Sequence, residues 1–248
     1  MEKQQAKRIL EHFLSLPLRS SAEVMAEFAR LPDAICGFDG GKQNFVYIPG
    51  TRPDRVLLAA HADTVWDDAY GAQGDLSQRI LFEDGVYKGA VGGHGIGADD
   101  RAGCAMLMLL KDSGHSLLIL DGEERGQIGA HHLEVEYPAL FEEINSHAYA
   151  IQLDRRGSID YKVYNLPVSD AFLRFIEEQT GYEDAGRNAR TDIVGLCKKM
   201  CGVNLSIGYY DEHTEKERLV FDEWYHTLQI VEALLQKPQK HYPLNGEA

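Results

Sequence analysis

Cysteines and basic residues are both scarce in this chain, and each shortage argues against a class of protein. The four cysteines, at positions 36, 104, 197 and 201, are scattered and lack the density of a secreted disulfide scaffold. Only 25 residues are Lys or Arg, against 39 that are Asp or Glu, which gives a formal net charge of −14. Nucleic acids and anionic membranes are bound by clustered cations, so we expect neither as a partner.

Long apolar runs are missing as well. No stretch approaches the roughly 20 apolar residues that cross a bilayer. The N-terminal segment 1–5 is not followed by an apolar signal core, so a cytoplasmic protein is expected. The apolar content of 44% is ordinary for a globular chain, and no internal repeat, low-complexity tract or linker divides it. One domain over residues 1–248 is the simplest organisation.

Motifs for covalent catalysis are absent too. The chain has no Gly-x-Ser-x-Gly elbow and no convincing pairing of a cysteine with a histidine. Cys197 and Cys201 stand one helical turn apart on a helix predicted over 192–201, where they could in principle hold a metal. Free cysteines more often pack as small hydrophobic residues, and we favour that interpretation.

Apolar periodicity predicts strands and helices in alternation. Strands are predicted at 44–49, 56–60, 117–120, 149–153 and 203–209, and a hairpin at 80–88. Helices are predicted over 4–15, 102–110, 128–134, 170–180, 192–201 and 220–236. A capping box at 20–23 opens a further helix that runs to residue 30. This order is typical of an α/β fold.

Acidic and histidine residues follow these strands at several points along the chain. The stretches are His61-Ala62-Asp63, Asp99-Asp100, Glu123-Glu124, Asp154 and His213. Three of them follow a predicted buried strand, and the carboxyl ends of parallel strands share the ligand-binding edge of an α/β sheet. We therefore expect the stretches to meet. Two imidazoles with several carboxylates suit zinc, cobalt or manganese, with a carboxylate left over for proton transfer.

Each stretch alone has an ordinary explanation. The aspartate pair could cap the following helix, Asp154 could pair with Arg155 on the surface, and the glutamate pair could be a solvated turn. Their joint occurrence favours a site. Asp63 can lie beside the imidazole of His61, because residues i and i+2 of a strand point the same way. Adjacent carboxylates at a buried strand end repel each other unless a cation neutralises them.

Together the stretches resemble the motifs of the co-catalytic (dinuclear) zinc exopeptidase superfamily. It includes single-domain aminopeptidases and the tripeptidase, glutamate carboxypeptidase and deacylase group. The matching segments are 60–64, 97–103, 122–130, Asp154 and 209–214. The resemblance implies a three-layer α/β/α sandwich around a mostly parallel mixed sheet. Many members insert a lid-like domain between the last two segments, but here only residues 155–212 lie there. We therefore expect a single catalytic domain without a lid.

The resemblance also implies a role for each residue. The metal ligands would be His61, Asp99, Glu124, Asp154 and His213. Asp99 would bridge two ions, with His61 and Asp154 on one and the remaining two ligands on the other. Spacing alone does not decide which of the adjacent aspartates bridges. Glu123 would be the general base, and Asp63 would orient His61. The cofactors would be two divalent ions, zinc first, with cobalt or manganese as alternatives.

The expected activity is hydrolysis of a peptide or amide bond by a hydroxide bound to the metal pair, and an aminopeptidase is favoured. Without a lid, no clamp for a substrate carboxylate is expected unless Arg155, Arg156, Arg190 or a neighbouring subunit supplies one. The alternatives are an N-acyl amino acid deacylase or dipeptidase and a catalytically inactive metal-binding scaffold. The last is disfavoured because the base and all ligands are present. The substrate would be a small peptide or N-acyl amino acid, and a homo-oligomer is left open.

Overall fold

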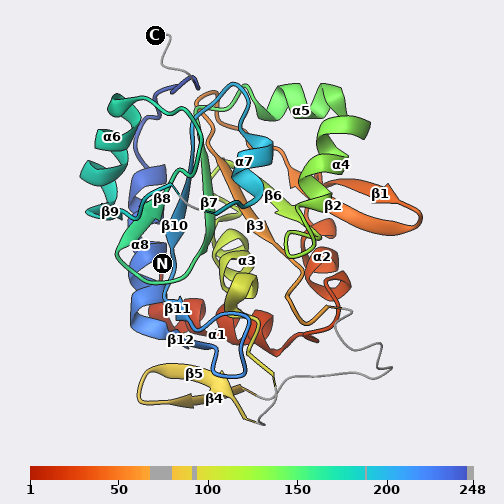
Figure 1. The fold of residues 1–248 in the computed structure, drawn as a ribbon, viewed down its shortest axis with the longest axis vertical. Helices are drawn as coiled ribbons and strands as arrows, with labels where there is room; N and C mark the ends of the chain where they lie inside the picture. The colour runs from red at the N-terminus through yellow and green to blue at the C-terminus, as the bar shows by residue number, and fades with distance from the viewer. Residues whose placement is uncertain (68–79, 91–93, 188, 245–248) are drawn as a thin grey trace.

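A mixed sheet of eight strands forms the centre of the molecule (Figure 1). The computed structural model describes residues 1–67, 80–90, 94–187 and 189–244. The strands lie in the order β1-β2-β6-β3-β7-β10-β8-β9. Their bounds are Ile35–Asp39 (β1), Lys42–Ile48 (β2), Leu57–His61 (β3), Ser116–Leu120 (β6), Ala150–Arg155 (β7), Asp160–Lys162 (β8), Glu183–Asp184 (β9) and Gly202–Ser206 (β10). The central strands β6, β3, β7 and β10 are parallel, while β2 and β8 run antiparallel to them.

Helices cover both faces of this sheet, so the predicted three-layer α/β/α architecture is confirmed. One face carries α1 (Lys3–Ser15), α2 (Ala22–Ala29), α3 (Ala98–Leu110), α6 (Asp170–Thr180) and α8 (Phe221–Leu235). The other carries α4 (Ile128–Glu136), α5 (Pro138–Ile144) and α7 (Asp192–Leu196). In β3, Leu58 and Ala60 pack in the first core and Leu57 and Ala59 in the second. Alternate residues face opposite cores, which explains why the central strands are apolar throughout.

A smaller antiparallel sheet lies at one end of the molecule, next to α1 (Figure 1). Its strands are β11 (Tyr209–Tyr210), β12 (Arg218–Val220), β5 (Val86–Gly89) and β4 (Ile80–Glu83), in that order. The predicted hairpin at 80–88 is therefore present. Asp84 and Gly85 form its turn, both with positive φ, at 49° and 82°. The loop between β11 and β12 carries His213, so this sheet anchors one side of the predicted site.

Most predicted elements are present with shifted ends, and the exceptions are short. The predicted strand at 203–209 divides into β10 and β11, and α5, β1, β8, β9 and β12 were not predicted. The capping box does not form, because the hydroxyl of Ser20 accepts the N–H of Ala22 at 3.2 Å and not that of Glu23. No helix in the described ranges is long and apolar enough to cross a membrane.

The helix predicted over 192–201 is wrong beyond Leu196. α7 ends there because Cys197 adopts extended dihedrals (φ −85°, ψ 100°) on the way into β10. Cys197 lies in the core on one face of the sheet, and Cys201 lies in the core on the other. The two thiols therefore do not face a common metal site. Both side chains are buried, in keeping with the interpretation of these cysteines as small hydrophobic residues.

Helix α3 approaches the sheet so closely that one of its positions has no room for a side chain. A Cβ atom on Gly103 would lie 2.1 Å from the carbonyl oxygen of Leu153 in β7 and 2.3 Å from Oδ1 of Asp100. The N–H of Gly103 also donates to that Oδ1, at 2.9 Å. This contact fixes the start of α3, and with it Asp99, against the carboxyl end of β7.

We expect Gly103→Ala to destabilise the fold by about 1–3 kcal/mol, because a methyl group in this gap forces backbone apart. Urea unfolding at constant m-value measures the loss. The matched control is Gly195→Ala in α7, where the nearest atom to an added Cβ is 3.5 Å away and alanine is the better helix former. Its stability should stay constant or rise, and equal stability of the two variants would contradict the close approach.

Candidate metal centre

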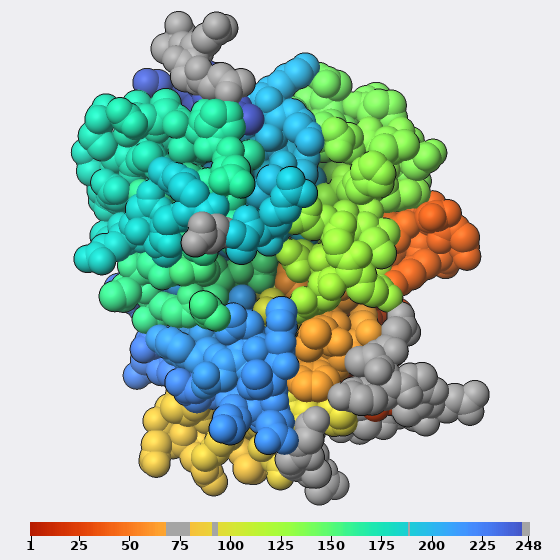
Figure 2. All heavy atoms as spheres, viewed as in Figure 1, coloured from red at the N-terminus to blue at the C-terminus, as the bar shows by residue number. Residues whose placement is uncertain are grey.

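The loops that follow β3, β6 and β7 meet the start of α3 and the β11–β12 loop at one edge of the main sheet. Figure 2 shows the β11–β12 segment, in blue, next to the segments near residues 64, 125 and 155 on the face toward the viewer. These segments carry all of the predicted ligands: His61, Asp99, Glu124, Asp154 and His213. The structure thus brings the five side chains together.

Asp99 lies between the two imidazoles. Its Oδ1 is 3.1 Å from Nε2 of His61, and its Oδ2 is 3.1 Å from Nε2 of His213. Asp99 is buried, and its dihedrals (φ −84°, ψ 100°) are not helical although it falls within α3. The predicted start of this helix after residue 101 agrees with that break. A carboxylate with one oxygen toward each imidazole has the geometry needed to bridge two cations.

A second carboxylate approaches the same Nε2 atom of each imidazole that faces Asp99. Oδ1 of Asp154 is 3.4 Å from Nε2 of His61, and Oε1 of Glu124 is 2.8 Å from Nε2 of His213. Two groups of three donors result, and they share Asp99. The ligand atoms of His61, Asp99 and Glu124 all lie within 4.8 Å of one another. Imidazole and carboxylate donors at this spacing fit divalent zinc, cobalt or manganese.

Backbone N–H groups bind both carboxylate oxygens of Asp100. Its Oδ2 accepts the N–H of His61 at 3.1 Å, and its Oδ1 accepts the N–H of Gly103 at 2.9 Å. The three-donor group of His61, Asp100 and Asp154 also has ligand atoms within 4.8 Å of one another. Because both oxygens of Asp100 already accept hydrogen bonds, the geometry favours Asp99 as the bridging residue.

Asp63 connects the predicted ligands more widely than the sequence indicated. Its Oδ1 lies 3.5 Å from Nδ1 of His61, but the nearer partner of that nitrogen is the main-chain oxygen of Asp63, at 3.0 Å. The carboxylate instead accepts the N–H groups of Glu123 at 3.1 Å and Glu124 at 3.3 Å. Asp63 therefore orients both the imidazole and the glutamate turn.

Several buried polar residues that the sequence analysis missed hold the ligands in place. Gln152 and Thr191 both donate to Oδ2 of Asp154, at 2.8 and 3.0 Å. Glu217 accepts the N–H of Asp99 at 3.0 Å through Oε1 and, through Oε2, the N–H of Gly97 at 2.8 Å. An amide or a carboxylate buried in an apolar setting is costly unless it is paired, so Gln152 inside a predicted strand was a usable signal.

Asp192 is a further missed residue, at the start of α7. It is 1% exposed, and neither carboxylate oxygen has a hydrogen-bond partner among the described residues. Burial raises its pKa to about 8. In the sequence it resembled an ordinary acidic residue in the first turn of a helix, so local pattern gave no reason to single it out.

The pKa values of several groups at this centre are shifted strongly, because the groups are buried and face one another. Hydrogen bonds to Asp99 and Glu124 raise the pKa of His213 to about 11. Burial by itself lowers the pKa of His61, but the neighbouring carboxylates, Asp154 first, raise it well above its usual value. Burial also raises the pKa of Glu123 to about 9. In the metal-free chain the imidazoles are therefore protonated and supply the positive charge that the carboxylates need.

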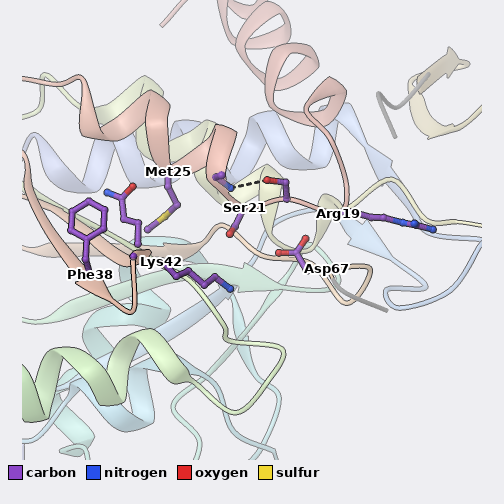
Figure 3. Close-up of a pocket in the computed structure, with 10 residues that line it drawn as sticks. Arg19, Ser21, Met25, Phe38, Lys42 and Asp67 are labelled. Carbon is purple, nitrogen blue, oxygen red and sulfur yellow. Dashed lines mark hydrogen bonds between the residues drawn. The ribbon is translucent and has the colours of Figure 1, made fainter. Parts of the chain in front are cut away.

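The cavity at this centre has a volume of about 270 Å³, and Glu123 lines it together with the predicted ligands Asp99, Glu124, Asp154 and His213. A larger cavity of about 510 Å³ lies next to α2 and the β1–β2 hairpin. Figure 3 shows Lys42 and Asp67 extending toward this second space. Its described lining residues include one carboxylate and no imidazole, so they offer too few donors for a metal. We therefore place the chemistry at the smaller cavity.

At the level of sequence, no family model and no curated protein matches the chain. Solved structures match nearly all of it. Aminopeptidase PepT from Bacillus cereus gives a TM-score of 0.67 at 14% identity, covering 95% of this chain and 98% of that one. A tripeptidase from Staphylococcus aureus gives 0.61 at 12%, covering 96% and 100%. The TET1 peptidase of Pyrococcus horikoshii, which can assemble into a tetrahedron or a large octahedral shell, gives 0.52 at 15%, covering 87% and 99%. The chain therefore has the fold of aminopeptidases and tripeptidases, in agreement with its resemblance to the co-catalytic zinc exopeptidases.

We expect Asp99→Asn to lower the occupancy of two metal sites at once, because each oxygen faces a different group of donors. Asp154→Asn should lower the occupancy of one site only. Elemental analysis after mild purification measures ions per chain for the wild type and both variants. A single tight ion that survives Asp99→Asn would rule out the shared carboxylate.

Metal binding at pH 8 should release about three protons per chain, one from each imidazole and one from Glu123, whose pKa burial raises to about 9. The pKa of His213, raised to about 11, and that of His61 keep both rings protonated in the metal-free chain at this pH. Free imidazoles would release fewer than about 0.1 proton there. Apparent affinity should therefore rise with pH between 6 and 9. Titration calorimetry with zinc in buffers of different ionisation enthalpy counts the protons, and a count near zero would contradict the ion-paired state.

Proposed function

We propose that this protein is a metal-dependent exopeptidase, and specifically an aminopeptidase, that cleaves a peptide or amide bond of a small substrate. The observation that carries the proposal is Asp99, which presents one carboxylate oxygen to each of two imidazoles. The peptidase fold of the whole chain supports it. One catalytic domain over residues 1–248 without a lid, and a cytoplasmic location, remain proposals from the sequence alone.

The proposed ligands divide into two sets around the bridge. His61 and Asp154 would hold one ion, Glu124 and His213 the other, and Asp99 both. Two divalent ions bound there, zinc or alternatively cobalt or manganese, would lower the pKa of a water molecule and polarise the scissile carbonyl. Gln152, Thr191 and Asp63 would keep their partners in orientation through the hydrogen bonds described above.

Glu123 is the proposed general base. It lines the cavity beside the ligands, while its neighbour Glu124 faces His213. Burial raises the pKa of Glu123 to about 9 in the metal-free chain, and adjacent cations would lower it, so that the carboxylate becomes available. Glu123 would take a proton from the attacking water and pass it to the leaving amine as the C–N bond breaks.

A homo-oligomer is the proposed assembly. The TET1 peptidase of similar fold assembles into large shells. Within the described residues, Phe38, Val135 and Ile159 are large apolar side chains that are at least 54% exposed. The proposal rests on these two observations.

Glu123→Gln should separate catalysis from metal binding. The amide keeps the size of the side chain but cannot accept the proton, so we expect kcat to fall by about 10²–10⁴-fold with folding and metal content unchanged. Glu124→Gln weakens a ligand instead, so excess zinc or cobalt should restore part of its activity. Rates on a panel of aminoacyl amides, dipeptides and N-acyl amino acids provide the measurement. If Glu123→Gln keeps most of the activity, the assignment of the base is wrong; if the metal-loaded wild type cleaves nothing, the inactive scaffold is favoured.

A further inference from the structure

Cationic side chains line the cavity of the candidate metal centre together with the acidic residues. This cation wall consists of Arg155, Arg156, Lys162 and Arg190. The chain as a whole has a net charge of −14, with only 25 Lys and Arg among 248 residues. Four of these cations around a cavity of about 270 Å³ are therefore unlike the rest of the protein. Such a concentration of positive charge favours an anionic ligand.

Two members of the cation wall already have carboxylate partners. Arg155 makes a bidentate ion pair with Asp160, with both N···O distances at 2.9 Å. Arg156 pairs with Glu212 at 2.9 Å, and Glu212 also lines the cavity. These pairs fix the frame of the wall and neutralise part of its charge.

Lys162 and Arg190 complete the cation wall. Nζ of the half-buried Lys162 lies 5.8 Å from the ring centroid of Tyr164, which also lines the cavity. Burial lowers the pKa of Lys162, and so do the charges of Arg155 and Arg156, which means that an anion bound nearby would stabilise the ammonium. Arg190 is exposed, and no ion pair joins it to another residue in the described part of the chain.

Two residues of the cation wall are sequence neighbours of a proposed metal ligand or of a residue that binds one. Arg190 precedes Thr191, whose hydroxyl donates to Asp154 at 3.0 Å. Arg155 follows Asp154 in β7. Because the cation wall and the proposed ligands line the same cavity of about 270 Å³, a group held on this wall lies close to a carbonyl placed at the metals. The cavity is also smaller than the roughly 300–1,000 Å³ of pockets for drug-sized ligands, which favours a small substrate.

We propose that Lys162 and Arg190 bind a carboxylate of a short substrate, close to the bond that is cleaved. This inference rests on the proposed hydrolase function. Two substrate groups offer the same chemistry: the acidic side chain of an amino-terminal residue, and the free carboxylate of a dipeptide or an N-acyl amino acid. The residues of the wall would then provide a carboxylate clamp, for which the sequence analysis named Arg155, Arg156 and Arg190 as candidates.

Two pairs of matched substrates test the proposal with the metal-loaded protein. The amides of glutamate and glutamine differ in side-chain charge, and Ala-Ala and its C-terminal amide differ in the terminal carboxylate. Hydrogen bonds to charged groups lead us to expect kcat/KM to be about 10- to 100-fold higher for the charged member of at least one pair. Preference within the first pair identifies the side chain as the ligand, and preference within the second identifies the terminal carboxylate.

Lys162→Met and Arg190→Gln should each reduce this charged-to-neutral ratio by about 10-fold, mainly through a higher KM, with metal content unchanged. Arg30→Gln is the matched control: this residue follows the end of α2, its side chain is 73% exposed, and the substitution should leave the ratio as in the wild type. Equal rates for both members of each pair, or a preference that neither wall variant alters, would overturn the proposal while leaving the hydrolase intact.

A binding experiment separates this proposal from the hydrolase function. The same four compounds are titrated into metal-loaded Glu123→Gln protein, with and without Lys162→Met, and dissociation constants are measured by calorimetry. Tighter binding of a charged member that the lysine substitution abolishes supports the cation wall even if the wild type cleaves none of the compounds. Equal binding of charged and neutral members refutes it even if the wild type is an active peptidase.

Discussion

Several carboxylates crowd together at one edge of the sheet, and the placement of the positive charges at this site depends on that crowding. Asp99, Asp154, Glu123 and Glu124 line a single cavity, where partial burial strengthens the repulsion between like charges. Asp99 relieves that repulsion by facing an imidazole with each of its oxygens. Protonated imidazoles supply the necessary positive charge in the metal-free chain. Divalent ions would supply more of it, so the same arrangement that stabilises the folded chain also prepares it to bind metal.

Buried residues that are not themselves ligands keep these acids from moving apart. Glu217 ties the loop after His213 to the backbone of Asp99, while Gln152 and Thr191 hold Asp154 from β7 and from the start of α7. Asp99 and Asp154 are therefore each held by a residue outside their own helix or strand. Support of this kind fixes the direction of a donor atom, which decides whether a metal is bound tightly or loosely.

The fold and the cavity contribute differently to the proposed function. The fold is shared with peptidases at 12–15% sequence identity, so most positions in it tolerate substitution as long as the two apolar faces of the sheet are preserved. The chemistry depends on a few side chains around one cavity. Its acidic side would activate water and its cation wall would select the substrate, which gives the two sides separate roles and makes them separable by mutation.

Local pattern was sufficient to place the central strands and to predict that the candidate ligands meet, because a strand buried on both faces is apolar throughout and the carboxyl ends of parallel strands share one edge. Short elements such as α5, β8 and β9 were not predicted, because they are too short to show a periodic pattern of apolar residues. The choice between Asp99 and Asp100 needed the folded chain, since adjacent residues have the same spacing to every other motif. In the folded chain both oxygens of Asp100 accept backbone N–H groups, which favours Asp99 as the proposed bridge. The role of Glu217 could not be predicted either. Its hydrogen bond to Asp99 spans 118 residues, and contacts between distant residues leave no local pattern in a single sequence.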